Sequence, residues 1–129
     1  MEFDCKEISI DDSELGCRVT MSEKVDDGYY DDEWTIEELM DSIGPHIMIT
    51  RTYPEDDSED DYYHFESSDI EKNGELLDFE INLSRNKLSL LFDSEEFIVK
   101  FNIGNKKFEE LKAALEIIVG EKGKLNLQD

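Results

Sequence analysis

The sequence lacks the residues and motifs on which most enzymes depend. Its 129 residues include only two histidines, His46 and His64, and contain no P-loop, GxSxG, HExxH or dinucleotide-binding fingerprint. Because catalysis requires a positioned base, nucleophile or metal, an enzyme is the least expected class of function. The sequence predicts no cofactor.

Long apolar runs are also missing. No segment approaches the roughly 20 consecutive apolar residues that a membrane-spanning helix requires. The first residues, MEFD, lack the basic and then apolar regions of a signal peptide. These absences predict a cytoplasmic protein.

Cysteine is scarce, with only Cys5 and Cys17 in the chain. If residues 1–10 and 15–21 pair as a hairpin, Cys5 lies opposite Val19 or Thr20 and not opposite Cys17. A disulfide is therefore not expected. Both cysteines are predicted to be small buried residues.

Basic residues are rare in the first half of the chain. Residues 1–70 hold 23 acidic and four basic side chains, a net charge of −19, whereas residues 71–129 hold 12 acidic and nine basic side chains, a net charge of −3. Such a concentrated field steers association with a cationic partner, although a solubilising surface is the plainer alternative. It repels nucleic acid and anionic membranes, so direct binding to either is not expected.

Apolar periodicity predicts one α+β domain spanning residues 1–129, built on a mainly antiparallel sheet. The opening hairpin comprises a strand over 2–10 with a bulge near Lys6 and Glu7, a turn over 11–14, and a strand over 15–21 that points Leu15, Cys17, Val19 and Met21 inward. The central hairpin pairs 46–53 with 62–66 across a loop at 54–61.

A three-strand meander over 75–103 is the clearest pattern. Closing its first turn pairs Leu83 with Leu88, Ile81 with Leu90 and Phe79 with Phe92. Closing its second over 93–96 pairs Phe92 with Phe97, Leu90 with Val99 and Leu88 with Phe101. On the opposite face, Leu91 would then lie across from Ile98.

Two helices are predicted. Thr35 and Glu38 form a capping box for a helix over 35–43, which ends at Gly44 and Pro45. Asn105 caps a second helix over 106–119, which ends at Gly120 and is expected to cover the apolar face of the meander. Leu125 and Leu127 suggest an additional edge strand.

Two acidic-aromatic clusters, at 26–34 and 55–63, are the candidate binding surface. Aromatic rings supply contact area at interfaces, and carboxylates pair with Arg or Lys of a partner. Alternatively, some of the rings fold back to close the core. The candidate partner-binding residues are Asp26, Asp27, Tyr29, Tyr30, Asp31, Asp32, Glu33, Trp34, Glu55, Asp56, Asp57, Glu59, Asp60, Asp61, Tyr62 and Tyr63.

A metal site is weakly indicated. Neither acidic cluster has both the glycine and the glutamate that an EF-hand loop requires. His46 and His64 stand at opposite ends of the predicted central hairpin, where they could approach each other across the strands and seed a metal-responsive site. No ligand spacing supports that alternative.

The acidic clusters can also imitate a nucleic acid. An extended chain advances about 3.3 Å per residue, close to the axial rise of about 3.4 Å per phosphate along one DNA strand. In size, acidity, α+β patterning and acidic-aromatic loops, the whole chain resembles the immunity proteins of bacterial toxin systems, including contact-dependent growth inhibition. The resemblance implies a monomeric inhibitor that binds a cognate toxin domain, a basic protein such as a nuclease. A DNA-mimic antagonist of a nucleic-acid-binding defence protein is the alternative.

Overall fold

The computed structural model describes residues 2–23, 35, 44–54, 60–68, 73–120 and 122–128. The described part contains one helix, α2 (Asn105–Val119), and ten strands. The strands are β1 (Glu2–Asp4), β2 (Glu7–Ser13), β3 (Gly16–Ser22), β4 (His46–Thr52), β5 (Tyr62–Ser67), β6 (Gly74–Glu75), β7 (Phe79–Ser84), β8 (Lys87–Phe92), β9 (Glu95–Lys100) and β10 (Gly123–Leu127).

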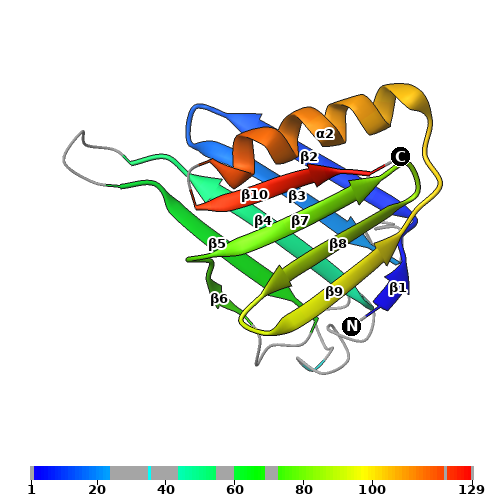
Figure 1. Ribbon diagram of the computed structural model, residues 1–129, viewed down its shortest axis with the longest axis horizontal. Coiled ribbons are helices and arrows are strands. Elements are labelled where there is room, and N and C mark those ends of the chain that lie inside the picture. Colours follow the sequence, from blue (N-terminus) through cyan, green and yellow to red (C-terminus); the bar gives the residue numbers. More distant parts are fainter. Residues whose placement is uncertain are drawn as a thin grey trace.

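The strands form two five-stranded sheets that pack face to face (Figure 1). Sheet A has the order β1-β9-β8-β7-β10, and sheet B has the order β2-β3-β4-β5-β6. Pairing is antiparallel except where β1 joins β9 and β10 joins β7. The predicted α+β character and mainly antiparallel pairing are confirmed, but the molecule is mostly β-structure. The predicted helix over 35–43 lies outside the described residues except for Thr35, so the described chain does not support a second helix.

The predicted bulge near Lys6 and Glu7 is wrong, because the chain changes sheets there. The amide of Cys5 donates to the carbonyl of Lys100 in β9 at 2.6 Å, and the amide of Lys6 donates to the carbonyl of Ser22 in β3 at 2.8 Å. The change of sheet explains why the apolar phase shifts between β1 and β2.

The opening hairpin is longer and tighter than predicted. Its strands extend to a direct pairing of Ser13 with Gly16, so the turn comprises only Glu14 and Leu15. Leu15 is consequently 74% exposed, contrary to the predicted inward position. The two cysteines are free and buried, as predicted. Burial, with added repulsion from nearby aspartates, raises the pKa of Cys17 to about 11.

The first half of the meander has the predicted register, with Leu83 opposite Leu88, Ile81 opposite Leu90 and Phe79 opposite Phe92. The second half is shifted by two residues, so that Leu90 faces Phe97 and Leu88 faces Val99. A shift of two keeps every side chain on its expected face, but it places Leu91 opposite Glu96 instead of Ile98.

A tight turn causes this shift. Asp93 and Ser94 have φ angles of 53° and 63°, as in the two-residue type I′ turns that connect antiparallel strands. The sequence pattern predicts a four-residue turn over 93–96. Positive φ at two non-glycine residues was not apparent from the sequence, because Asp-Ser is not the usual Asn-Gly or Asp-Gly signal.

We predict that Ser94→Gly stabilises the protein by about 0.5–1 kcal/mol, because glycine adopts positive φ without steric strain. The free energy of unfolding from urea denaturation would measure the change. Asn86→Gly is the control, because Asn86 lies in the β7–β8 turn and is not among the residues with positive φ. Equal stabilisation by both substitutions would contradict the role assigned to the turn conformation.

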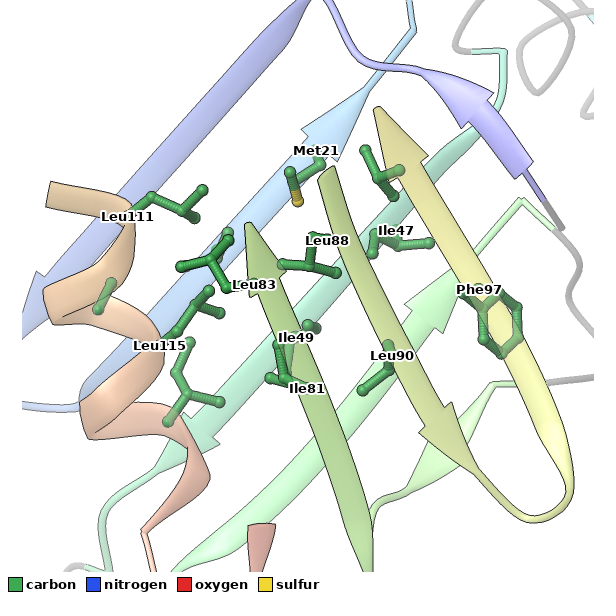
Figure 2. Packing of buried hydrophobic residues seen from close by; sticks show 14 of the residues in the cluster. Met21, Ile47, Ile49, Ile81, Leu83, Leu88, Leu90, Phe97, Leu111 and Leu115 are labelled. Atoms are coloured by element: carbon green, nitrogen blue, oxygen red, sulfur yellow. The ribbon is translucent and has the colours of Figure 1, made fainter. Parts of the chain in front are cut away.

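The hydrophobic core lies between the two sheets (Figure 2). Phe65 of sheet B packs against two mutually stacked rings of sheet A, with centroid distances of 4.9 Å to Phe92 and 4.7 Å to Phe97. Ile47 and Ile49 from β4 lie fully buried against the same layer. Sheet B therefore covers the apolar face of the meander.

Helix α2 occupies a different position from the one predicted. It begins at Asn105, with Gly104 as an N-cap that has no side-chain hydrogen bond, so Asn105 is not the cap. The helix lies beside β10 and packs mainly on β3, β10 and β4 (Figure 1). It buries Leu111 and Leu115 there because sheet B already occupies the meander face. Gly120 ends the helix, as predicted, and β10 supplies the suggested edge strand. Among the described residues, no helix is long and apolar enough to cross a membrane.

Candidate functional site

Most of the predicted binding residues lie outside the described part of the chain. These are the whole first cluster (Asp26, Asp27, Tyr29, Tyr30, Asp31, Asp32, Glu33 and Trp34) and, from the second cluster, Glu55, Asp56, Asp57 and Glu59. The described members are Asp60, Asp61, Tyr62 and Tyr63. Asp60 and Asp61 directly precede β5, and Tyr62 and Tyr63 are its first two residues, where the acidic segment enters sheet B.

The central hairpin places these four residues at one end of sheet B. β4 and β5 pair antiparallel, with Thr52 opposite Tyr62 and Ile47 opposite Ser67, which confirms the predicted pairing. Because side chains alternate along a strand, consecutive residues of β5 point to opposite faces of sheet B. Tyr62 is 45% exposed, whereas Tyr63 is 3% exposed.

Tyr63 belongs to the core. Its ring lies 6.1 Å from the ring of Phe79 in sheet A, and the ammonium group of Lys122 lies 5.6 Å above it. The alternative in which a ring folds back to close the core therefore applies to Tyr63. Tyr62 is the described tyrosine of this cluster that presents its ring to solvent.

Arg51 organises the base of the acidic segment. Its Nε donates to Oδ2 of Asp61 at 2.5 Å, its Nη2 forms an ion pair of 2.5 Å with the same oxygen, and its Nη1 donates to the carbonyl of Ile117 at 2.6 Å. Its guanidinium also lies 5.5 Å from the ring centroid of Tyr53 and 5.6 Å from that of Tyr63. Burial acts to lower the pKa of Arg51, but the pKa is raised because the hydrogen bond that Arg51 donates to Asp61, together with the electrostatic effect of Asp61 and the neighbouring tyrosines, favours the charged form.

This role of Arg51 was not predicted from the sequence. One feature of the sequence pointed to it: Arg51 is one of only four basic residues among the first 70, next to many carboxylates that could pair with it. Its bonds join β4, the acidic segment and the carboxyl end of α2, where the helix dipole favours a cation. Asp61 is therefore held within the protein, while Asp60 is exposed to solvent.

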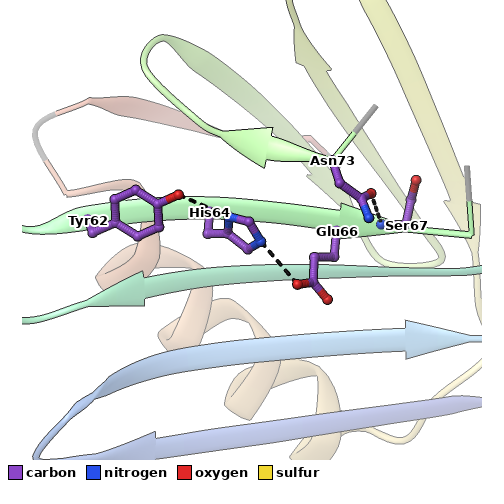
Figure 3. Close-up of polar contacts among 5 residues, drawn as sticks. All are labelled: Tyr62, His64, Glu66, Ser67 and Asn73. Atoms are coloured by element: carbon purple, nitrogen blue, oxygen red, sulfur yellow. Dashed lines mark hydrogen bonds and ion pairs between the residues drawn. The ribbon is translucent and has the colours of Figure 1, made fainter. Parts of the chain in front are cut away.

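A polar row runs along the outer face of β5 (Figure 3). The hydroxyl of Tyr62 lies 3.3 Å from Nδ1 of His64, and Nε2 of His64 lies 3.1 Å from Oε1 of Glu66. The rings of Tyr62 and His64 stack with centroids 5.7 Å apart and an interplanar angle of 24°. We call Tyr62, His64 and Glu66 the β5 row.

Neighbouring strands extend this polar face. His64 lies between Thr50 of β4 and Glu75 of β6, and Thr50 pairs with Arg18 of β3. An exposed ion pair of 3.2 Å joins Arg18 to Asp11 of β2. The face combines a stacked aromatic pair with carboxylates, which suits recognition of a polar, cationic protein surface.

The two histidines do not approach each other. His46 lies beside Ser68, whose amide donates to the His46 carbonyl at 3.1 Å, whereas His64 lies opposite Thr50. The four-residue offset along β4 separates them by about 13 Å. The expected approach is wrong, and within the described ranges no three His, Cys, Asp or Glu side chains form a group that could hold a metal.

Comparison with protein-family models, curated proteins and solved structures found no match to this chain.

Proposed function

We propose that this protein is an immunity-type inhibitor that binds and neutralises a cognate toxin domain with a basic surface. The observation that carries the proposal is the β5 row, an exposed tyrosine stacked on a histidine and followed by a carboxylate, which continues directly from the acidic segment 55–61. The net charge of −22 supplies the matching long-range field. No catalytic step by this chain is required.

The proposed mechanism begins with electrostatic steering. The acidic first half of the chain attracts the basic surface and speeds the encounter. Tyr62 then supplies a desolvated contact, because tyrosines at the centre of interfaces contribute much of the binding energy. The bound inhibitor covers the toxin's active site or its approach, so a toxin that acts on nucleic acid loses access to its substrate.

A pull-down from native cells, performed at low and then moderate salt, identifies the partner. Recovery of one basic toxin domain in stoichiometric amount is the expected result. Its association rate should fall as ionic strength rises, and a rate insensitive to salt would contradict the electrostatic mechanism.

The contact surface is tested with Tyr62→Ala. We predict that the dissociation constant for the recovered toxin rises about 30-fold, as expected for the loss of an aromatic anchor. Isothermal titration calorimetry measures the change. Leu127→Ala is the matched control, because Leu127 is similarly exposed at 53% but lies on β10 of sheet A. Equal effects of the two substitutions would exclude the β5 row as the contact.

The same pull-down distinguishes the DNA-mimic alternative. Recovery of a general DNA-binding protein, with DNA competing for the complex, would replace the immunity proposal with that one. The exposed Asp60 and the extended path of β5 would fit either target, so the identity of the recovered protein decides between them.

A further inference from the structure

The two ring nitrogens of His64 have partners of different chemical kinds (Figure 3). Nε2 lies 3.1 Å from Oε1 of Glu66, and Nδ1 lies 3.3 Å from the hydroxyl of Tyr62. A carboxylate can only accept a hydrogen bond, whereas a tyrosine hydroxyl can donate or accept one. The contact with Glu66 therefore decides which ring nitrogen carries the proton.

The neutral imidazole carries one ring proton, and Glu66 holds that proton on Nε2. Nδ1 is then an acceptor, so the hydroxyl of Tyr62 donates to it. Because its hydrogen is used within the protein, the Tyr62 oxygen presents its lone pairs to the solvent. The exposed Tyr62 thus offers an approaching partner an acceptor and not a donor.

Protonation of His64 reverses this arrangement. Both ring nitrogens of an imidazolium are donors, so Nδ1 then donates to the Tyr62 oxygen and the hydroxyl hydrogen turns towards the solvent. Histidine is the side chain whose charge changes between about pH 5 and 8, and the partly exposed ring of His64 is open to protons from water. Acid therefore changes both the charge of the β5 row and the hydrogen-bonding role of Tyr62.

The groups on the neighbouring strands are compatible with both states of His64. Those that face it are Thr50 on β4, Glu75 on β6 and, one strand beyond Thr50, Arg18 of β3 with its partner Asp11 of β2. Arg18 is the cation of this set, and its 3.2 Å ion pair with Asp11 offsets its charge. Carboxylates on β5 and β6 accommodate the imidazolium, so protonation leaves His64 in the β5 row.

We infer that His64 is a positioning residue, which prepares Tyr62 at neutral pH to accept a hydrogen bond from a lysine or arginine of the basic partner and weakens that binding in acid. Lysine and arginine side chains carry donors and no acceptor, so they match the Tyr62 oxygen while His64 is neutral. Once His64 is protonated, a donor faces a donor and a new positive charge faces a cation. The nature of the partner rests on the proposed function, whereas the proton position rests on the contacts within the β5 row.

NMR of the isolated, nitrogen-15-labelled protein at about pH 8 tests the proton position. Long-range proton–nitrogen spectra distinguish a protonated ring nitrogen from an unprotonated one, and the proton of His64 is expected on Nε2. His46 is an internal reference of the opposite kind, because its Nδ1 lies 2.9 Å from the carbonyl of Gly44, which can only accept. A proton on Nδ1 of His64, or equal amounts of the two tautomers, would overturn the inference.

Two carboxylate variants separate the hydrogen bond from general electrostatics. E66A removes the acceptor at Nε2 and should convert His64 to a mixture of tautomers. E75A removes an equal charge from the strand that faces His64 and should leave the proton on Nε2. The same spectrum for both variants would show that the contact with Glu66 does not place the proton.

The consequence for binding is measured with the toxin domain recovered in the pull-down. When the pH is lowered from about 7.5 to about 5.5, its dissociation constant should rise about fivefold more with the wild-type protein than with H64Q, whose side chain cannot be protonated. The comparison cancels any titration of the toxin itself, and equal pH dependence would overturn the acid effect. The NMR experiment needs no toxin, so the proton position and the proposed function fail independently.

Discussion

Replacing Phe65 with alanine is expected to lower the free energy of unfolding by about 3–5 kcal/mol. Phe65 is fully buried and touches Phe92 and Phe97 of the opposite sheet. Its removal leaves a cavity between two sheets whose backbones cannot close around it. Urea denaturation followed by circular dichroism measures the loss.

Two controls separate this packing effect from general damage to β5. Phe65→Leu keeps most of the apolar volume and should cost less than about 1.5 kcal/mol. Tyr62→Ala, three positions earlier and facing solvent, should change stability by no more than about 0.5 kcal/mol. A loss below about 1 kcal/mol for Phe65→Ala would mean that Phe65 does not join the two sheets.

Replacing Arg51 with methionine is expected to lower the free energy of unfolding by about 2–3 kcal/mol. The substitution retains a long apolar side chain but leaves the Asp61 carboxylate and the Ile117 carbonyl without their donor. Breaking a fully buried pair costs more, but the side chains of Arg51 and Asp61 are both 24% exposed, so water compensates part of the loss.

Arg18→Met is the matched control for Arg51→Met. Arg18 also lies in sheet B and pairs with an aspartate, Asp11, but both side chains are at least half exposed. Its replacement should change stability by less than about 0.5 kcal/mol. Comparable losses for the two arginines, measured by the same denaturation experiment, would contradict a special role for Arg51.

Arg51 also connects stability to the proposed function. Because it fixes Asp61, it sets the direction in which the chain leaves the acidic segment and enters β5. Asp61 is predicted to bind a partner, and in the structure its carboxylate pairs with Arg51. Among the four described residues of the clusters, Asp60 and Tyr62, on either side of Asp61, are exposed.

Local pattern predicted much of the fold correctly. The alternation in β7 and β8 specified their register residue by residue, because a slip by one would expose the whole apolar face. The central hairpin, the range of α2 and its end at Gly120 followed from the same kind of signal. The second meander turn was misplaced because a shift of two residues leaves the apolar pattern unchanged, so only the positive φ angles of Asp93 and Ser94 distinguish the two registers.

The candidate site was predictable only in part. Asp60 and Tyr62 were identified from their composition and lie exposed, but alternation along β5 buries Tyr63, and the partner of Asp61 lies ten residues earlier in the chain. His64 was weighed as a metal ligand, and its actual contacts with Tyr62 and Glu66 follow from their shared face on one strand.

The sequence by itself determined which residues are apolar, which strands pair with their neighbours and where the acidic charge is concentrated, because these properties depend on spacing along the chain. The tertiary structure decided which surfaces meet. It sends β1 and β2 to different sheets, covers the meander with sheet B, and leaves α2 beside β10. It also brings Arg51 to Asp61 and packs Phe65 against Phe92 and Phe97. Those contacts join residues that are far apart along the chain. Apolar periodicity along one strand indicates that one of its faces is buried, but it does not indicate which surface covers that face.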